Sequence, residues 1–450
     1  MNTIFAQCSA HGKSGIAVFR ISGPNALKAL EFILRRKIDN LEARMLYLRK
    51  IYHPKKDIPI DEAMIVFFKK NASFTGEDSV EIYTHGSLAV IKLMNEALIS
   101  IDDLRLAEPG EFAKRAFLNG RMDLTSAEGL ADLIEAETEM QHRQAIMQLG
   151  GSLEKIYEKW RKQLLEIIGL VEAYIDFPDE DIPPETLEQI DNFAEKLIAE
   201  IKMHLDDNNR GERLRDGIKL AVIGKPNVGK SSLINYLMQR EVSIVSNIAG
   251  TTRDVIEAHI DIGGYPIILQ DTAGINADTT DEIEREGIVR AWKAAKNSDI
   301  KIILFDASNF ETESFAEDKN LFSEVMNENM IIVFNKIDIA SNNVPKRLSN
   351  VPVIGVSVKE RHNLEILLNE ITYIAEKIAS PSESPQITRA RHRSQLERAL
   401  EYMNNFSIHD DLVLAAEDLR MTMRSISNIT GKITVDEILG EIFGNFCIGK

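Results

Sequence analysis

Nine residues, GKPNVGKSS at 224–232, have the types and spacing of a loop that binds nucleotide phosphates. Gly224 and Gly229 permit a turn whose backbone N–H groups point at phosphate oxygens, and the helix expected after the loop adds its dipole. Lys230 would reach the β- and γ-phosphates, and the Ser231 hydroxyl would bind Mg²⁺. The other loop residues expected at the nucleotide are Asn227, Val228 and Ser232.

Two polar segments further along the chain would complete the magnesium site. The first, SNIAGTT at 246–252, offers Thr252 as a second hydroxyl ligand. The second, DTAG at 271–274, would bring Asp271 to the ion through water and the Gly274 N–H to the γ-phosphate. The residues expected at the nucleotide are Ser246, Asn247, Ile248, Ala249, Gly250, Thr251, Thr252, Asp271, Thr272, Ala273 and Gly274.

The motif NKID at 335–338 is expected to select the base. The Asp338 carboxylate can accept two hydrogen bonds from guanine, whereas adenine would leave it without these donors. Asn335 would connect this loop to the phosphate loop, and the Lys336 stem would cover the base. Backbone groups of Ser357, Val358 and Lys359 would contact the guanine oxygen. These motifs in this order predict GTP rather than ATP.

Hydrolysis needs a group that orients water, and the usual glutamine after D-x-x-G is replaced by Ile275. Lys230 and Asp271 are expected to serve catalysis by holding the phosphates and the metal ion. Asn227 and backbone carbonyls of 246–252 could hold a monovalent cation in place of an arginine finger. A role for Asn227 in stabilising the loop fits the sequence equally well.

Short apolar runs separated by helical stretches must position these motifs, as in a doubly wound α/β domain. The runs expected to form its strands are 218–224, 265–271, 299–307, 330–336 and 351–357.

The residues before this domain form two regions of different pattern. Strand patterns at 15–21, 62–68 and 78–86, with helical patterns at 26–34 and 88–98, predict an α+β domain. Apolar residues then recur at helical spacing through 124–149 and 160–175, which predicts long amphipathic helices. Prolines must interrupt them within 176–185.

Helical sequence returns at 388–446, after a proline-containing hinge at 380–385. We therefore expect one helical domain into which the α/β domain is inserted; the alternative is two helical segments that never meet. The expected N-terminal α+β domain is 1–120. The two parts of the helical domain are 121–215 and 379–450, and the nucleotide-binding domain between them is 216–378.

Composition points to a globular protein of the cytosol. The 450 residues are 44% hydrophobic and 27% charged, without a run long enough to span a bilayer or a convincing signal peptide. With Cys8 and Cys447 as the two cysteines, a disulfide framework is not expected, and Cys447 is expected to be a small buried residue. The net charge of −17 means that a nucleic-acid partner would need a local basic patch or a second protein.

The chain resembles the tRNA-modification GTPase MnmE (TrmE) family. The resemblance rests on the motifs above, on FRISG at 19–23, on SFTGEDSVEIYTHG at 73–86, on EPGEFAKRAFLNGRMDL at 108–124, and on the terminal CIGK. It implies an N-terminal tetrahydrofolate-binding domain that builds a homodimer. It also implies a GTPase that, with the flavoprotein GidA (MnmG) in a heterotetramer, adds carboxymethylaminomethyl or aminomethyl groups at C5 of the wobble uridine of certain tRNAs.

The resemblance also implies site residues. Potassium, around which the G domains dimerise, would be bound by Asn227, Ser246, Ile248 and Thr251, and Glu284 would orient water. A 5-formyl- or methylene-tetrahydrofolate would be bound by Arg20, Glu81, Arg121 and Lys450. Asn276 stands where the family usually has arginine, so any contact made by that arginine is not expected here.

Two other functions use the same nucleotide motifs. A ribosome-assembly or RNA-binding switch GTPase would usually carry a basic RNA-binding domain, whereas this chain is acidic and shows no basic stretch interleaved with aromatic residues. A scaffold with an inactive G domain is disfavoured by the intact Lys230, Ser231, Asp271 and Asp338.

Overall fold

The computed structural model describes residues 2–38, 41–177, 183–240, 257–270, 296–309, 328–340, 344–345, 347–348, 351–380, 384–432, 439, 442–444, 446–447 and 449. The chain divides into two compact units. The first unit comprises Met1–Ala131, Glu154–Lys159 and Ile426–Lys450, and the second unit comprises Asp132–Leu153 and Trp160–Ser425. Among the helices of the described residues, none is both long and apolar enough to cross a membrane.

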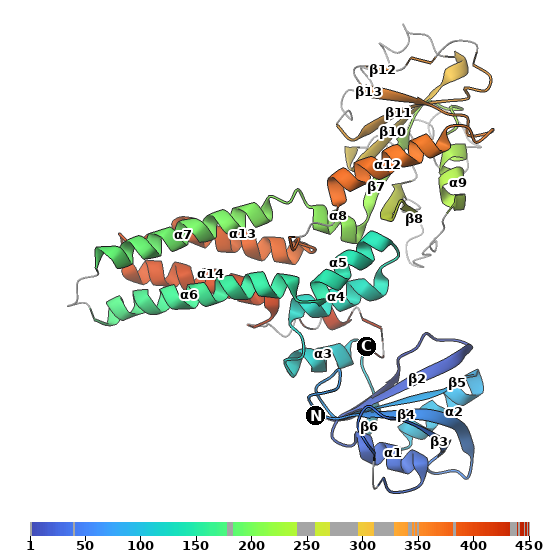
Figure 1. Ribbon diagram of the computed structural model, residues 1–450, viewed down its shortest axis with the longest axis vertical. Helices are drawn as coiled ribbons and strands as arrows, with labels where there is room; N and C mark the ends of the chain where they lie inside the picture. The colour runs from blue at the N-terminus through green and yellow to red at the C-terminus, as the bar shows by residue number, and fades with distance from the viewer. Residues whose placement is uncertain are drawn as a thin grey trace, which may run out of the picture. The chain divides into compact units, whose positions relative to one another are not determined.

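A mixed six-stranded sheet forms the framework of the first unit (Figure 1). Its strands are β1 (Thr3–Gln7), β2 (Ser14–Ser22), β3 (Leu46–Tyr52), β4 (Pro59–Phe68), β5 (Ser79–Gly86) and β6 (Leu104–Leu106), in the order β3-β4-β5-β2-β1-β6. Helices α1 (Ala26–Leu34) and α2 (Leu88–Ile99) bury apolar residues against the sheet. The strands predicted at 15–21, 62–68 and 78–86 are confirmed, whereas β1, β3 and β6 were not anticipated.

The far end of the chain completes a second apolar cluster in the first unit. Helices α3 (Glu111–Leu118) and α4 (Leu124–Glu135) contribute to it together with residues after 438. This C-terminal cluster contains Ala113, Leu124, Ala127, Leu439, Phe443 and Phe446. The approach is close at Gly110, which has a φ of 64° and where a Cβ atom would lie 2.3 Å from the Phe443 carbonyl oxygen. Segments that are far apart in the sequence therefore share one core.

A seven-stranded sheet, parallel except at its two edges, forms the centre of the second unit. Its strands are β7 (Ile218–Ile223), β8 (Glu257–Ile262), β9 (Tyr265–Gln270), β10 (Ile300–Asp306), β11 (Met330–Asn335), β12 (Arg347–Leu348) and β13 (Val351–Gly355), in the order β12-β13-β11-β10-β7-β9-β8. A short 3-10 helix, η1 (Ala307–Asn309), follows β10. The five predicted strands are confirmed, and the antiparallel edge strands β8 and β12 are additional.

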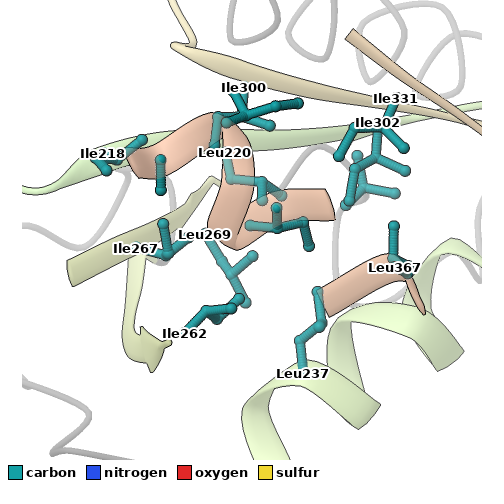
Figure 2. Packing of buried hydrophobic residues seen from close by; sticks show 14 of the residues in the cluster. Ile218, Leu220, Leu237, Ile262, Ile267, Leu269, Ile300, Ile302, Ile331 and Leu367 are labelled. Atoms are coloured by element: carbon teal, nitrogen blue, oxygen red, sulfur yellow. The ribbon is translucent and has the colours of Figure 1, made fainter. Parts of the chain in front are cut away.

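Alternate residues of these strands supply two apolar faces. Ile218 and Leu220 of β7 lie on the face that packs against α9 (Lys230–Arg240) and α12 (Leu364–Ala379), as Figure 2 shows for Leu237 and Leu367. Ala221 and Ile223, further along β7, belong to a separate cluster with residues of β10 and β11. Burial on both faces explains why the strands are nearly continuous apolar runs in the sequence.

Helices make up the rest of the second unit, and parts of two of them fall in the first unit. They are α5 (Glu139–Leu149), α6 (Ser152–Asp176), α7 (Pro184–Leu205), α8 (Arg210–Asp216), α13 (Ala390–Asn405) and α14 (Leu412–Thr430). Helix α13 packs against α7, so helices from before and after the sheet do meet. The predicted fold class is confirmed: an α+β domain is followed in the sequence by a helical domain with an inserted P-loop α/β domain.

The helical pattern at 124–149 is not one helix. It is divided into α4 and α5, because Thr138 and Gln141 form a capping box that starts a new helix. The expected interruption within 176–185 agrees with α6 ending at Asp176 and α7 beginning at Pro184.

One carboxylate contacts the chain on both sides of the inserted domain. Asp132 Oδ1 accepts a hydrogen bond from Arg215 Nε at 2.8 Å and another from Arg389 Nη2 at 2.7 Å. Arg215 lies just before β7, and Arg389 follows α12. A largely buried carboxylate that pairs with two arginines fixes the local geometry of both connections.

Candidate functional site

The segment 224–232 begins at the carboxyl end of β7 and continues into the first turn of α9. Strand β7 has β10 on one side and β9 on the other, so the order of the strands reverses here. Open α/β sheets bind ligands at the carboxyl ends of the strands at such a point. At Gly229 φ is 103°, and a Cβ atom would lie 2.2 Å from Asn335 Nδ2; at Gly224 it would lie 2.4 Å from the Leu304 carbonyl oxygen. Both positions therefore require glycine, and the loop leads into a helix N-terminus suited to phosphate.

The Lys230 side chain lies within the curve of this loop. Its Nζ donates hydrogen bonds to the carbonyl oxygens of Gly224 and Lys225, both at 2.8 Å. Burial lowers the pKa of Lys230 from its ordinary value. Ser231 and Ser232 are exposed in the first turn of α9. A cation and hydroxyls at a helix N-terminus are the groups that a magnesium-bound phosphate chain needs.

Asn335 connects three loops of the candidate site. Its Nδ2 donates to the Val228 carbonyl oxygen at 2.9 Å, and its Oδ1 accepts from the Val358 N–H at 3.1 Å. The side chain is buried, so both bonds are shielded from water. The phosphate loop, the NKID loop and the 357–359 loop are therefore held to one another by a single amide.

Asp338 and Ser357 form the part of the site expected to read the base. Asp338 is exposed, whereas Ser357 is buried. A hydrogen bond from Ser357 lowers the pKa of the Asp338 carboxyl, so it stays ionised and able to accept hydrogen bonds. Lys359 is exposed, and its ammonium lies 3.9 Å from the Glu360 carboxylate.

Lys336 makes contacts that the sequence did not reveal. Its Nζ donates to the Asn227 carbonyl oxygen at 2.8 Å and to Asp306 Oδ2 at 2.6 Å. Burial alone would raise the pKa of Asp306, but hydrogen bonds from Lys336 and Ser308 outweigh it and lower the pKa. The signal available in the sequence was the position of Asp306 at the end of a predicted parallel strand, at the same sheet edge as Lys336.

Part of the predicted site lies outside the described residues. This group includes Thr252 and Asp271, predicted at Mg²⁺, Glu284, predicted to orient water, and Lys450, predicted at folate. Three of the predicted potassium ligands belong to it as well. The predicted site residues that lie outside the described residues are Ser246, Asn247, Ile248, Ala249, Gly250, Thr251, Thr252, Asp271, Thr272, Ala273, Gly274, Glu284 and Lys450. Their roles stay predictions.

Arg20 and Glu81, expected at a second site in the first unit, are paired with each other. They are directly opposite in the β2–β5 register, and their side chains form an ion pair at 2.9 Å. The Arg20 guanidinium lies 5.1 Å from the ring centroid of Phe74 and 5.5 Å from that of Phe112. The arrangement combines charge with aromatic surface, which suits a flat, charged ligand.

Tyr83 also joins this group, which the sequence did not predict. Its hydroxyl donates to Glu81 Oε2 at 2.6 Å. Burial, together with this hydrogen bond, raises the pKa of Tyr83 to about 12. Tyr83 lies two residues after Glu81 on β5, so strand alternation could have placed both side chains on one face.

The remaining folate candidates are only partly described. Arg121 is exposed, and a Cβ atom at Gly76 would lie 3.2 Å from its Cγ, so it lies beside the 73–78 loop. Gly449, just before Lys450, packs against β1: a Cβ atom there would lie 2.3 Å from the Gln7 carbonyl oxygen. The prediction that Cys447 is buried is wrong, because this residue is exposed directly after the buried Phe446.

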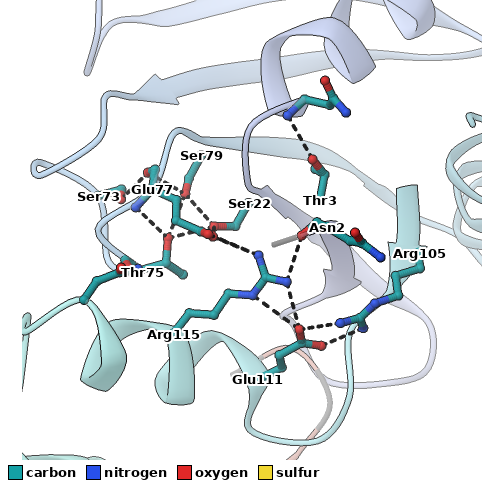
Figure 3. Close-up of polar contacts among 12 residues, drawn as sticks. Asn2, Thr3, Ser22, Ser73, Thr75, Glu77, Ser79, Arg105, Glu111 and Arg115 are labelled. Atoms are coloured by element: carbon teal, nitrogen blue, oxygen red, sulfur yellow. Dashed lines mark hydrogen bonds and ion pairs between the residues drawn. The ribbon is translucent and has the colours of Figure 1, made fainter. Parts of the chain in front are cut away.

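A buried ion-pair network adjoins this second site through shared segments (Figure 3). Arg115 on α3 pairs with Glu77 Oε2 at 3.0 Å and with Glu111 Oε1 at 2.9 Å, and it donates to the Asn2 carbonyl oxygen at 2.8 Å. Glu111 also pairs with Arg105 at 2.6 Å. The network therefore joins α3 to the start of β1, to β6 and to the loop that carries Phe74.

Comparisons with known proteins agree with this architecture. A family model described as GTP-binding protein TrmE N-terminus matches residues 3–121, and one described as MnmE helical domain matches residues 124–447. The tRNA modification GTPase MnmE of Rickettsia canadensis (strain McKiel) is 55% identical over 454 residues, covering 100% of both chains. That of Rickettsia prowazekii (strain Madrid E) is 54% identical over 451 residues, again covering 100% of both.

Among solved structures, the G domain of the T. maritima FeoB iron transporter covers 35% of this chain and 98% of its own, at 27% identity. The TM-score of 0.27 is too low to support any argument. By its two family models and its full-length relatives, the chain belongs to the family of the tRNA modification GTPase MnmE.

Proposed function

We propose that the protein hydrolyses GTP and that this cycle controls modification of the wobble uridine, position 34, of certain tRNAs in the cytoplasm. Its contribution, with a GidA (MnmG) flavoprotein in a heterotetramer, is to install carboxymethylaminomethyl or aminomethyl groups at C5. The observation that supports GTP binding most strongly is Asn335, which joins the phosphate loop to both base-binding loops. Family membership supports the tRNA reaction.

In this proposal each described residue of the nucleotide site has one task. Backbone N–H groups of 227–232 bind phosphate oxygens, Lys230 balances their charge, and Asp338 accepts from guanine. The hydroxyl of Ser231, with Thr252 and Asp271, would hold Mg²⁺, which neutralises charge on the phosphates. The exposed Ser231 at the start of α9 fits such a role.

We further propose that potassium, bound by Asn227, Ser246, Ile248 and Thr251, supports dimerisation of G domains, with Glu284 orienting water. A cation at that position would take the place of an arginine finger, for which the sequence offers no identifiable candidate. GTP hydrolysis should therefore be at least about tenfold faster in potassium chloride than in sodium chloride at equal ionic strength. Equal initial rates of phosphate release in the two salts would exclude the cation from the mechanism.

The first unit is proposed to bind a tetrahydrofolate derivative and to form the homodimer. The Arg20 guanidinium, which lies close to the rings of Phe74 and Phe112 and pairs with Glu81, fits a ligand with a flat ring and polar edges. Arg121 and Lys450 would meet its carboxylates. Equilibrium dialysis against a reduced folate tests this assignment; no retention of any reduced folate would reject it.

The homodimer is supported by apolar side chains on the edge strand β3. Leu46 and Leu48 are 54% and 53% exposed, and Met64 of β4, opposite Leu48, is 37% exposed. An exposed apolar edge of this kind is suited to pairing with a second chain. A monomer by light scattering at micromolar concentration would reject the homodimer.

The tRNA function is tested by mass spectrometry of nucleosides from cells that lack the protein. We expect the C5-modified wobble uridines to disappear, to return with the wild-type gene, and to stay absent with Lys230→Ala. The same cells should keep a normal ribosome profile. Unchanged wobble uridines together with accumulated ribosomal precursors would instead favour a ribosome-assembly GTPase.

A further inference from the structure

We infer that Asp306 is a positioning residue for the guanine nucleotide, because its ion pair with Lys336 holds the base-reading loop against the phosphate loop. The inference rests on the proposed binding of GTP at this site. Asp306 is the last residue of β10 and lies opposite Asn335 in the β10–β11 register. It belongs to none of the motifs that the sequence singles out.

Both carboxylate oxygens of Asp306 are engaged, so the group has a fixed orientation. Oδ1 accepts from the Ser308 N–H at 2.9 Å and from the Ser308 hydroxyl at 2.6 Å. This leaves Oδ2 directed at Lys336 Nζ, at 2.6 Å. The two bonds from Ser308 set the direction of the carboxylate before any nucleotide is present, which is the condition for a preorganised contact.

Lys336 connects the oriented Asp306 carboxylate to the phosphate loop. Its ammonium also donates to the Asn227 carbonyl oxygen at 2.8 Å, and both residues have left-handed backbone conformations, with φ of 66° and 64°. Such conformations are unfavourable for residues other than glycine and persist when surrounding contacts hold them. The Asp306 carboxylate also offsets positive charge beside a loop that already contains Lys230.

The ion pair holds little of the fold together by itself. The Lys336 side chain is 32% exposed and that of Asp306 is 14% exposed, and partly exposed pairs of this kind contribute little to global stability. Its contacts lie instead at the residues that surround the nucleotide. Loss of the carboxylate should therefore appear in nucleotide affinity more than in unfolding.

The test is Asp306→Asn in the full-length protein, with release of fluorescent methylanthraniloyl-GDP and methylanthraniloyl-GTP followed by stopped flow. We expect both nucleotides to dissociate about tenfold faster, because the contact involves the base loop and not the γ-phosphate. KM for GTP should rise similarly, while kcat at saturation changes less than about twofold. In a Lys336→Met background the same substitution should alter release by less than about twofold.

Asp299→Asn is the matched control. Asp299 directly precedes β10 at the opposite end of that strand, where it pairs with Arg213 at 2.9 Å. This variant should release both nucleotides at the wild-type rate. Wild-type release rates for Asp306→Asn, a fall in kcat with KM unchanged, or an equal effect in the Lys336→Met background would each overturn the inference. Failure of the wild-type protein to bind GTP would reject the proposed function instead.

Discussion

Asp338→Asn is expected to weaken GTP binding by at least about 100-fold, because guanine would lose the acceptor for two of its N–H donors. The carboxylate is exposed in the structure, and the hydrogen bond from Ser357 keeps its pKa low. It is therefore ionised at neutral pH. Titration calorimetry with GTP and ATP measures the change, and the wild-type preference for GTP should nearly vanish in the variant.

Xanthosine triphosphate is the control ligand for this variant. It has a carbonyl where guanine has an amino group, so an asparagine amide can donate to that carbonyl and accept from the neighbouring N–H. Asp338→Asn should bind it more tightly than GTP, which would show that the pocket is intact. Unaltered selectivity for GTP would remove Asp338 from base recognition.

Arg115→Met is expected to lower the local free energy of unfolding of the first unit by about 3–5 kcal/mol, since it leaves buried carboxylates without their cation. The Arg115 side chain is 5% exposed, and its partners Glu77 and Glu111 are 14% and 11% exposed. Hydrogen exchange of the slowest amides of β1, β2 and α3 in the full chain measures this free energy. No change in their protection would show that the network contributes nothing to stability.

Arg105→Met provides the matched control, because Arg105 shares the partner Glu111 but its side chain is 42% exposed. Its loss should cost about 1 kcal/mol or less.

Burial would raise the pKa of Glu111, but hydrogen bonds from Arg105, the Glu108 N–H and Arg115 lower it from 4.5 to about 2. The stabilisation that ionised Glu111 gives the folded state is therefore complete at pH values above its ordinary pKa of 4.5, and it is lost as the pH falls towards 2. The cost of Arg115→Met should shrink over the same range.

The sequence predicted the strands whose side-chain pattern reflects burial alone. Strands β7, β9, β10, β11 and β13 are buried on both faces and appear as apolar runs. Strand β3 was missed because Leu46 and Leu48 alternate with residues of intermediate exposure on an edge strand, a weak signal in isolation. The division between α4 and α5 was readable from Thr138 and Gln141, but the continuous helical periodicity obscured it.

Contacts within the sites were predictable only where a motif encodes them. The link from Asn335 to Val228 follows from the order of the nucleotide motifs. Asp306 was not assigned a role, because its partner Lys336 directly follows another strand and only the parallel register brings the two together. The pairing of Arg20 with Glu81 likewise depends on the β2–β5 register, which the sequence does not specify.

The C-terminal cluster has a consequence for biosynthesis. Ala113, Leu124 and Ala127 leave the ribosome early, whereas Leu439, Phe443 and Phe446 follow the entire inserted domain. During translation the nascent first unit therefore exposes an unfinished apolar surface that only the last-made segment can cover. Such a surface is a natural target for chaperones, and its closure must wait for a long-range contact late in synthesis.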